Sequence, residues 1–372
     1  MKVAYVLSHI NKSLQWLWFS EELKARNFPH FFIIIDKGLP ILVGDLQNIG
    51  VPVYCLKHKH FFSYFINLYK IIKIFKSENP DIVHTSLPTG NFLGQLAAFI
   101  CGIKKRITTC ENASWPHDFN SNKQLIIDRI TYWSATKIIS TCESAYEYLA
   151  TTWKINHQKL SIIYQGLKIN ELEIISEEKI KNLRAQLGIN DHDFILGMVA
   201  RFEFWKGHSY VLDAMKKVIE KYPEIKLYIF GGKGAEYEKI KNKIEKMGLD
   251  NHVFYKGFVS DPLTLYKIFD VHIHVPINKF VETFGINIVE GMISECPQML
   301  TKSGIAFTTA VNMENCIVVD YCNSDQIADA IIKLKNDLLL RKKLAQNAKA
   351  DALFLFNHDR KVNTIMKLYQ SL

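Results

Sequence analysis

Short apolar runs rich in β-branched and aromatic residues alternate with longer helical patterns along the whole chain. In the first half, such runs predict strands at Val3–Leu7, Phe31–Ile35, Val51–Cys55, Ile82–His84, Ile107–Thr109, Lys137–Ser140 and Leu160–Ile163. In the second half, they predict strands at Phe194–Val199, Ile225–Phe230, His252–Tyr255, Val271–Val275, Gln298–Leu300 and Cys316–Val319. Strands that alternate with helices favour parallel sheets, so we predict an α/β fold with two doubly wound sheets.

A chain of 372 residues exceeds one ordinary core and suggests two domains. The charged stretch Lys168–Asn190 separates the halves, and within it Ser176 and Gly188 mark the start and end of a helix. We therefore predict an N-terminal domain of residues 1–168 and a C-terminal domain of residues 169–355. Ligands bind beyond the carboxyl ends of the strands in such sheets, so two facing domains imply a cleft.

Composition and hydropathy indicate the compartment in which the protein is expected. No apolar run reaches the roughly 18 to 20 residues of a membrane helix, and the first apolar stretch is too short for a signal peptide. Seven cysteines without a Cys-x-x-Cys pair favour free thiols in a reducing compartment. Together these features predict a cytoplasmic protein.

The net charge of +9 is concentrated in the first half, where residues 1–165 hold 18 Lys and Arg against 11 Asp and Glu. A basic half can attract phosphate-bearing substrates, an anionic membrane surface or nucleic acid. Nucleic acid is the weakest candidate because no recognisable binding motif accompanies the charge.

Two acids eight positions apart, Glu282 and Glu290, flank a turn at Phe284-Gly285-Ile286. Glycine lets a ligand approach the backbone closely, and the N–H groups of a first helical turn suit a phosphate. The first acid lies in a loop, and the second is expected two turns into the helix. They could bracket a ligand with phosphates and hydroxyls, or they could be solvated surface acids.

Two cations follow the first strand of the second half. Arg201 lies at its carboxyl end, and Lys206 lies five residues later, before the next helix. They could converge on one diphosphate, or they could be solvated loop charges. Glycine turns that contain Gly231 and Phe258 follow the next two strands, and a nucleobase could rest against the backbone of the second turn.

The motifs of the second half, in this order along the chain, resemble those of a known family. Gly-x-x-x-Arg-x4-Lys-Gly, Phe-Gly-Gly-x-Gly, Phe-x-x-Gly-Phe-Val and Glu-x7-Glu around Phe-Gly are similar to the motifs of the retaining family-4 glycosyltransferases of the GT-B fold. The segments Pro80–His84, Leu93–Ala98, Ile139–Ser144 and Ile162–Leu167 resemble landmarks of the same family in the first half. The resemblance therefore covers nearly the whole chain.

The resemblance implies two Rossmann-like domains, with a last helix of about 356–372 that packs back on the first domain. It implies that the C-terminal domain binds a nucleotide-sugar donor and that the N-terminal domain binds a glycan or lipid-linked acceptor. It also implies a hexosyltransferase that retains anomeric configuration, works without metal or cofactor and serves cell-surface polysaccharide synthesis. Such acceptors make peripheral contact with the inner face of an anionic membrane conceivable.

The same resemblance assigns residue roles. Arg201 and Lys206 would neutralise the donor diphosphate and help the nucleotide depart. Glu282 would bind hydroxyls of the transferred sugar, and Glu290 would accept hydrogen bonds from the ribose. The backbone of Gly285 and Ile286 would hold phosphate, and Phe284, Gly231 and Phe258 would complete the donor site.

The sequence departs from the family in two places. Glu111 stands where many relatives have a histidine, and it could contact the donor sugar or the acceptor, or be a structural acid. The loop after the first strand lacks the usual glycines, and its His9, Asn11 and Lys12 could face the acceptor side.

Two other functions stay open: a nucleotide-sugar epimerase on the same scaffold, and a catalytically silent nucleotide-sugar-binding subunit. The basic, aromatic segment His58–Phe65 could form a membrane-surface helix. An ordinary helix with one apolar face against the sheet is favoured there.

Overall fold

The structure is a computed structural model, and it describes residues 1–58, 60, 62–111, 114–119, 121–168, 175–257, 259 and 261–372. The chain divides into two compact units. Unit 1 contains Met1–Lys168 together with Asn357–Leu372, and unit 2 contains Ile169–Phe356. Within the described residues, no helix is long and apolar enough to cross a membrane.

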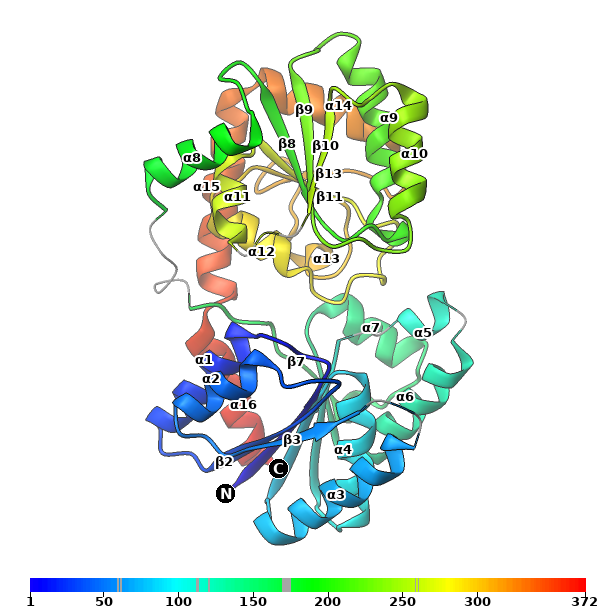
Figure 1. The fold of residues 1–372 in the computed structure, drawn as a ribbon, viewed down its shortest axis with the longest axis vertical. Coiled ribbons are helices and arrows are strands. Elements are labelled where there is room, and N and C mark those ends of the chain that lie inside the picture. Colours follow the sequence, from blue (N-terminus) through cyan, green and yellow to red (C-terminus); the bar gives the residue numbers. More distant parts are fainter. Residues whose placement is uncertain are drawn as a thin grey trace. The chain divides into compact units, whose positions relative to one another are not determined.

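Unit 1 is built on a seven-stranded parallel sheet with the strand order β3-β2-β1-β4-β5-β6-β7 (Figure 1). The central strands are buried on both faces, as apolar runs of parallel sheets require. The strands are β1 (Val3–Ser8), β2 (His30–Asp36), β3 (Val53–Lys57), β4 (Ile82–Ser86), β5 (Lys105–Cys110), β6 (Lys137–Ser140) and β7 (Leu160–Ile162).

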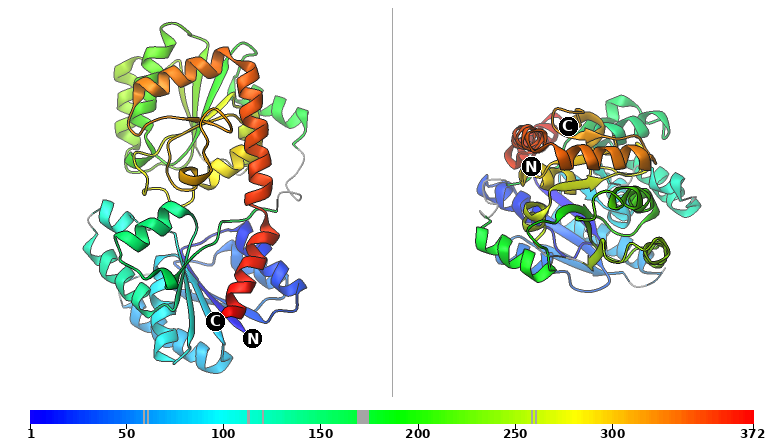
Figure 2. Two further views of the ribbon diagram at one scale, coloured as in Figure 1. Left: turned by 180° about the vertical axis from the view of Figure 1, so that it is seen from behind. Right: turned by 90° about the horizontal axis from the view of Figure 1, so that it is seen from above.

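Helices cover both faces of this sheet. The core on one face includes side chains of α1, α2 and α16, and the core on the other includes side chains of α3 and α4. The red helix α16, from the end of the chain, lies beside α1 and the first strands in both views (Figure 1, Figure 2). The helices are α1 (Leu14–Ala25), α2 (Ile41–Asn48), α3 (Ser63–Glu78), α4 (Pro88–Ile100), α5 (Trp115–Asp118), α6 (Asn122–Ser134), α7 (Glu143–Thr151), the 3-10 turn η1 (His157–Lys159) and α16 (His358–Ser371).

Unit 2 repeats the architecture with six parallel strands in the order β10-β9-β8-β11-β12-β13. Its strands are β8 (Phe194–Val199), β9 (Ile225–Phe230), β10 (Val253–Gly257), β11 (Val271–His274), β12 (Gln298–Leu300) and β13 (Ile317–Val318). Its helices are α8 (Glu177–Leu187), η3 (Phe204–Lys206), α9 (His208–Ile219), α10 (Tyr237–Met247), α11 (Pro262–Ile268), α12 (Ile286–Ile293), α13 (Ala306–Thr309), α14 (Ser324–Asn336) and α15 (Leu338–Leu355).

The predicted fold class is therefore confirmed: each unit is a doubly wound parallel sheet. The order of connections reverses between β1 and β4 in unit 1 and between β8 and β11 in unit 2. A crevice for ligands forms at such a switch point, beyond the carboxyl ends of the strands. One expectation was wrong in detail: α12 begins at Ile286, so Glu290 lies one turn into the helix and not two.

Candidate active site

The loops after β8 and β11 meet at the switch point of unit 2. Gly207 precedes α9 with φ 81°, and a Cβ atom there would lie 2.1 Å from the carbonyl oxygen of Val275. Only glycine allows this approach of the two backbones. The close approach places Lys206, at the end of η3, against the loop that carries Glu282.

Glu282 is the centre of the resulting cluster. Its Oε2 accepts a hydrogen bond from Nζ of Lys206, and each of the two side chains is 16% exposed. His274 Nε2 lies 3.5 Å from the same oxygen. Because both contacts engage Oε2, Oε1 is the oxygen with which Glu282 can accept a hydrogen bond from a hydroxyl group.

His274 is fixed as a neutral ring by Asn287, a residue of α12. Nδ2 of Asn287 donates to the carbonyl oxygen of Val199 at 3.0 Å and to Nδ1 of His274 at 2.8 Å. Since Nδ1 accepts, Nε2 carries the ring proton and directs it toward Glu282. Burial, with the charge of Lys206, holds the pKa of His274 well below its usual value. Neither residue was among the predicted site residues, although His274 lies in the predicted strand Val271–Val275 and is the last residue of β11.

The turn before α12 has the form that its sequence predicts. Gly285 adopts φ 86° as the residue preceding the helix, and Phe284 is buried. Within the described part of the chain, the N–H groups of Gly285 and Ile286 donate no hydrogen bond, as expected for a first helical turn. Gly304 packs beneath this turn, where a Cβ atom would lie 2.9 Å from Cγ of Glu282.

Glu290 accepts a hydrogen bond from Tyr266, whose hydroxyl donates to Oε2 of Glu290 at 3.1 Å. Burial raises the pKa of Glu290 to about 7, against the opposing effect of that hydrogen bond. The carboxyl group therefore changes its charge near neutral pH.

The remaining predicted donor residues are Arg201, Gly231 and Phe258, and their surroundings differ. Arg201 is exposed, and its Nη1 lies 3.6 Å from Oε1 of Glu203. Gly231 uses both backbone groups internally, because its N–H donates to Gly257 and its carbonyl oxygen accepts from the Tyr255 hydroxyl. A Cβ atom at Gly231 would meet the carbonyl oxygen of Ala200 at 2.4 Å, so packing alone requires this glycine. Phe258 lies outside the described residues.

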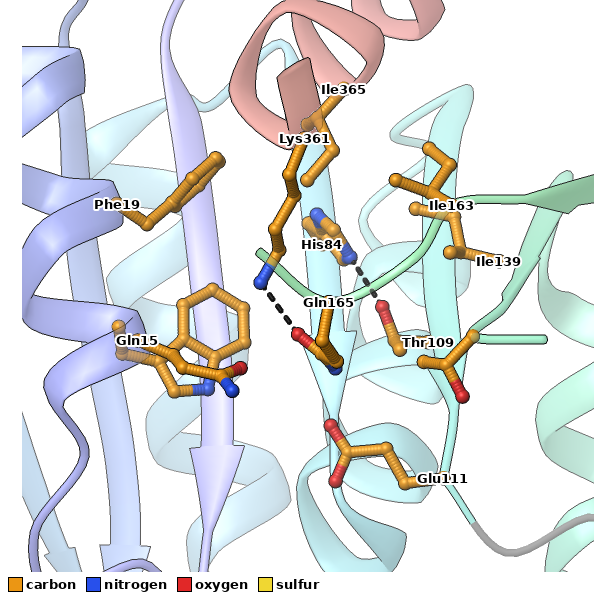
Figure 3. A pocket seen from close by; sticks show the side chains of 12 residues that line it. Gln15, Phe19, His84, Thr109, Glu111, Ile139, Ile163, Gln165, Lys361 and Ile365 are labelled. Carbon is orange, nitrogen blue, oxygen red and sulfur yellow. Dashed lines mark hydrogen bonds between the residues drawn. The ribbon is translucent and has the colours of Figure 1, made fainter. Parts of the chain in front are cut away.

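Unit 1 holds a second polar cluster around Glu111, which follows β5. Oγ of Ser86 donates to Oε1 of Glu111 at 2.6 Å. Nζ of Lys361, from α16, donates to Oε1 of Gln165 at 2.6 Å, and Lys361, Gln165 and Glu111 line one cavity of about 50 Å³ (Figure 3). Burial raises the pKa of Glu111, while the Ser86 hydrogen bond and the Lys361 charge oppose that rise. Burial lowers the pKa of Lys361 to about 8.

A buried hydrogen-bonded chain lies behind this cavity. His84 bonds Thr109 through Nε2 at 2.9 Å and Tyr369 of α16 through Nδ1 at 2.5 Å. The Tyr369 hydroxyl also lies 3.1 Å from that of Tyr5. Burial lowers the pKa of His84 to about 3, so the ring is neutral. Lys361 and Tyr369 were not predicted as site residues, because no local pattern indicates which strands the last helix covers.

The loop after β1 is fixed by its own contacts. His9 adopts φ 51° and lies 3.3 Å from Oγ1 of Thr89 through Nε2. Asn11 accepts from the first residues of α2, through its carbonyl oxygen from Leu42 and through Oδ1 from Ile41. Lys12 is exposed. Asn11 thus has a structural explanation as a cap of α2.

Comparison with known families identifies the chain. Residues 179–351 match the family described as glycosyl transferases group 1, and residues 19–171 match glycosyltransferase family 4. The chain is a glycosyltransferase. The first match contains Arg201, Lys206, Glu282 and Glu290, and the second contains Glu111.

Two relatives and one solved structure illustrate the similarity of this glycosyltransferase. It is 25% identical to an uncharacterized glycosyltransferase of Methanocaldococcus jannaschii, over 88% of this chain and 86% of the relative. It is 27% identical to the capsular polysaccharide biosynthesis glycosyltransferase CapM of Staphylococcus aureus, over 77% of this chain and 76% of CapM. HepE of Anabaena, solved in complex with UDP and glucose, superposes with a TM-score of 0.85 at 21% identity over 100% of both chains. This likeness shows the GT-B fold.

Proposed function

We propose that this glycosyltransferase moves a hexose from a UDP-sugar to a glycan or lipid-linked acceptor, with retention of anomeric configuration, in the synthesis of a cell-surface polysaccharide. Unit 2 binds the donor and unit 1 binds the acceptor. HepE, with its bound UDP and glucose, supports the choice of a UDP-sugar, and CapM supports a role in polysaccharide synthesis.

The Lys206–Glu282–His274 cluster is the observation that carries the proposal. A cation and a carboxylate held side by side at a strand terminus match a donor that carries a diphosphate beside a sugar. Lys206 stabilises the negative charge that develops on the departing diphosphate, and the turn at Gly285 and Ile286 supplies N–H groups. Glu282 accepts a hydrogen bond from a sugar hydroxyl, and the neutral His274 keeps the carboxylate oriented.

Charge stabilisation is assigned to protein groups and not to a metal ion. Lys206 and Arg201 provide two cations, and the first turn of α12 provides a partial positive charge. We therefore expect full activity in excess EDTA. A loss of activity that Mg²⁺ or Mn²⁺ restores would contradict this assignment.

A thermal-shift panel of UDP-, GDP-, ADP- and CMP-sugars tests the donor. A ligand that binds only the native state raises the melting temperature, and we expect UDP-hexoses to do so. Stabilisation by another nucleotide sugar alone would overturn the choice of base. No stabilisation by any of them would overturn the proposed function.

Two substitutions separate the parts of the donor that the cluster binds. Lys206→Met should weaken UDP and the UDP-sugar alike, by about 10- to 100-fold, as expected for a lost hydrogen bond to a charged group. Glu282→Gln should leave UDP binding intact and remove the additional affinity for the sugar. Lys217→Met is the control, because Lys217 forms an exposed ion pair with Asp325 elsewhere in unit 2. Isothermal titration with both ligands measures these effects, and equal losses in all three variants would contradict the assignment.

Product analysis with donor alone distinguishes transfer from epimerisation. A transferase yields UDP only when an acceptor or water takes the sugar, whereas an epimerase yields a new sugar nucleotide without acceptor. Detection of the epimeric sugar nucleotide by chromatography would replace the proposed function by an isomerase.

A further inference from the structure

Helix α3 has two apolar faces. As the sequence predicts, one face packs on the sheet, where Ile71 and Phe75 are buried. The opposite face, at the start of the helix, exposes four large apolar side chains at helical spacing. They are Phe62 (71% exposed), Phe65 (63%), Ile66 (49%) and Tyr69 (59%). An ordinary covering helix would place polar residues there.

The two neighbouring helices extend this apolar surface. Helix α3 packs on α4, and α4 packs on α6, as Figure 1 shows. Helix α6 exposes Ile126 and Trp133, and the end of α4 exposes Phe99 and Ile100. The rings of Phe99 and Trp133 are 4.9 Å apart, and Nζ of Lys123 lies 5.7 Å from the ring centre of Tyr64. The outer sides of α3, α4 and α6 therefore form one face, which we call the α3–α6 face.

The charge on the α3–α6 face has one sign. All residues of these three helices are described, and they contain the five cations Lys70, Lys73, Lys76, Lys123 and Arg129, all exposed. Their two acids do not offset this charge at the surface. Asp128 is buried, and Glu78 is engaged by Lys2 and by the Tyr54 hydroxyl.

We propose that the α3–α6 face docks this glycosyltransferase on an anionic lipid bilayer. Exposed aromatic and aliphatic side chains insert at the boundary between headgroups and acyl chains, and lysines beside them attract lipid phosphates. A second copy of the chain is a poorer occupant, because a twofold interface would set five cations against the same five. The docking does not depend on the identity of the sugar donor.

Co-sedimentation with vesicles tests the proposal on the full chain. Vesicles of phosphatidylcholine with about 30% phosphatidylglycerol, which have an anionic surface, are compared with vesicles of pure phosphatidylcholine. We expect binding to the anionic vesicles, weak binding to the neutral ones, and release in about 0.5 M salt, at which exposed charges are screened. Equal binding to both kinds of vesicle, or to neither, would overturn the proposal.

Variants identify the surface. Phe65→Ser with Tyr69→Ser should remove most of the binding, and Lys70→Ser with Lys73→Ser should lower the partition coefficient by about fivefold for each lysine. Leu339→Ser is the control, because Leu339 is the most exposed large apolar side chain among the described residues of unit 2 (79%). Donor-induced thermal stabilisation should be unchanged in every variant, so a failure of the membrane proposal can be distinguished from a failure of the proposed donor.

Light scattering tests the alternative occupant of the face. If it shows an oligomer that the Phe65/Tyr69 variant dissociates, the face is a self-association surface and the proposal is wrong.

Discussion

At the scale of single residues, burial decides the charge of the groups that would handle substrate. His274 and His84 are kept neutral inside the protein, while the pKa of Glu290 is raised to about 7 and that of Lys361 is lowered to about 8. Spacing in the sequence can suggest that Glu282 and Glu290 belong to one site. It cannot show that Glu282 pairs with a lysine while Glu290 accepts a hydrogen bond from a tyrosine hydroxyl.

Glu290 should make donor binding depend on pH. The ionised carboxylate would accept stronger hydrogen bonds from the ribose hydroxyls than the protonated carboxyl group. With a pKa of about 7, its ionised fraction rises as pH rises from 6 to 8. Affinity for a UDP-sugar should therefore be up to about tenfold weaker at pH 6 than at pH 8. Titration calorimetry measures this, with a UDP-sugar instead of UDP because a terminal phosphate itself titrates near pH 6, at about the value for phosphate monoesters.

The matched variant for this prediction is Glu290→Gln. Glutamine keeps the size of the side chain and cannot ionise, so affinity should be low and nearly constant across this pH range. A variant that keeps the full pH dependence would show that another group controls it.

Lys361 should act on the reaction as a positioning residue through Glu111. Its charge opposes the rise in the pKa of Glu111, so Lys361→Met should move the acid limb of the pH profile of kcat/KM to higher pH. Lys361→Arg keeps the charge and should keep the profile. An unchanged acid limb in Lys361→Met would favour a purely structural role for Glu111.

At the scale of elements, the surroundings of a glycine at a helix terminus decide whether another residue could replace it. Gly188, after α8, and Gly207, before α9, both have positive φ, and their surroundings differ. Nothing lies within 4 Å of a Cβ atom built at Gly188, whereas one at Gly207 would overlap the Val275 carbonyl. From the sequence the two glycines look alike, because each lies at the boundary of a predicted helix.

This pair gives a prediction for stability. Gly188→Ala should cost about 1 kcal/mol, the strain of a left-handed backbone. Gly207→Ala should cost about 3 kcal/mol, because overpacking is added to that strain. Denaturant unfolding compares the two variants. Gly207→Ala should also weaken donor binding, since it separates Lys206 from Glu282, and equal costs in the two variants would contradict the close approach.

At the scale of the whole molecule, the last helix completes the first unit. Helix α16 is separated from β7 by all of unit 2 in the sequence, yet Val362, Ile365 and Tyr369 belong to the core of unit 1. The same helix delivers Lys361 to the cavity at Glu111. Unit 1 can therefore form its complete core only after α16 has been synthesised.

Removal of one side chain of α16 tests this dependence. Tyr369→Ala should destabilise unit 1 by about 4 kcal/mol, as large core truncations do, while Tyr369→Phe should cost about 1 kcal/mol for its lost hydrogen bonds. Hydrogen exchange resolved by peptide is the appropriate measurement, because two units need not unfold in one transition. Faster exchange in unit 2 than in unit 1 would contradict the assignment of α16 to unit 1.

Local pattern determined the strands, the doubly wound class and the glycosyltransferase motifs, because alternation of apolar runs, helix caps and glycine turns are properties of neighbouring residues. Tertiary structure decided the partners of those residues: Lys206 and His274 at Glu282, Tyr266 at Glu290, and Lys361 near Glu111. It also decided that the aromatic start of α3 faces outward. These contacts join residues far apart in the chain, and the desolvation that sets their charges exists only after the sheets and helices have packed around them.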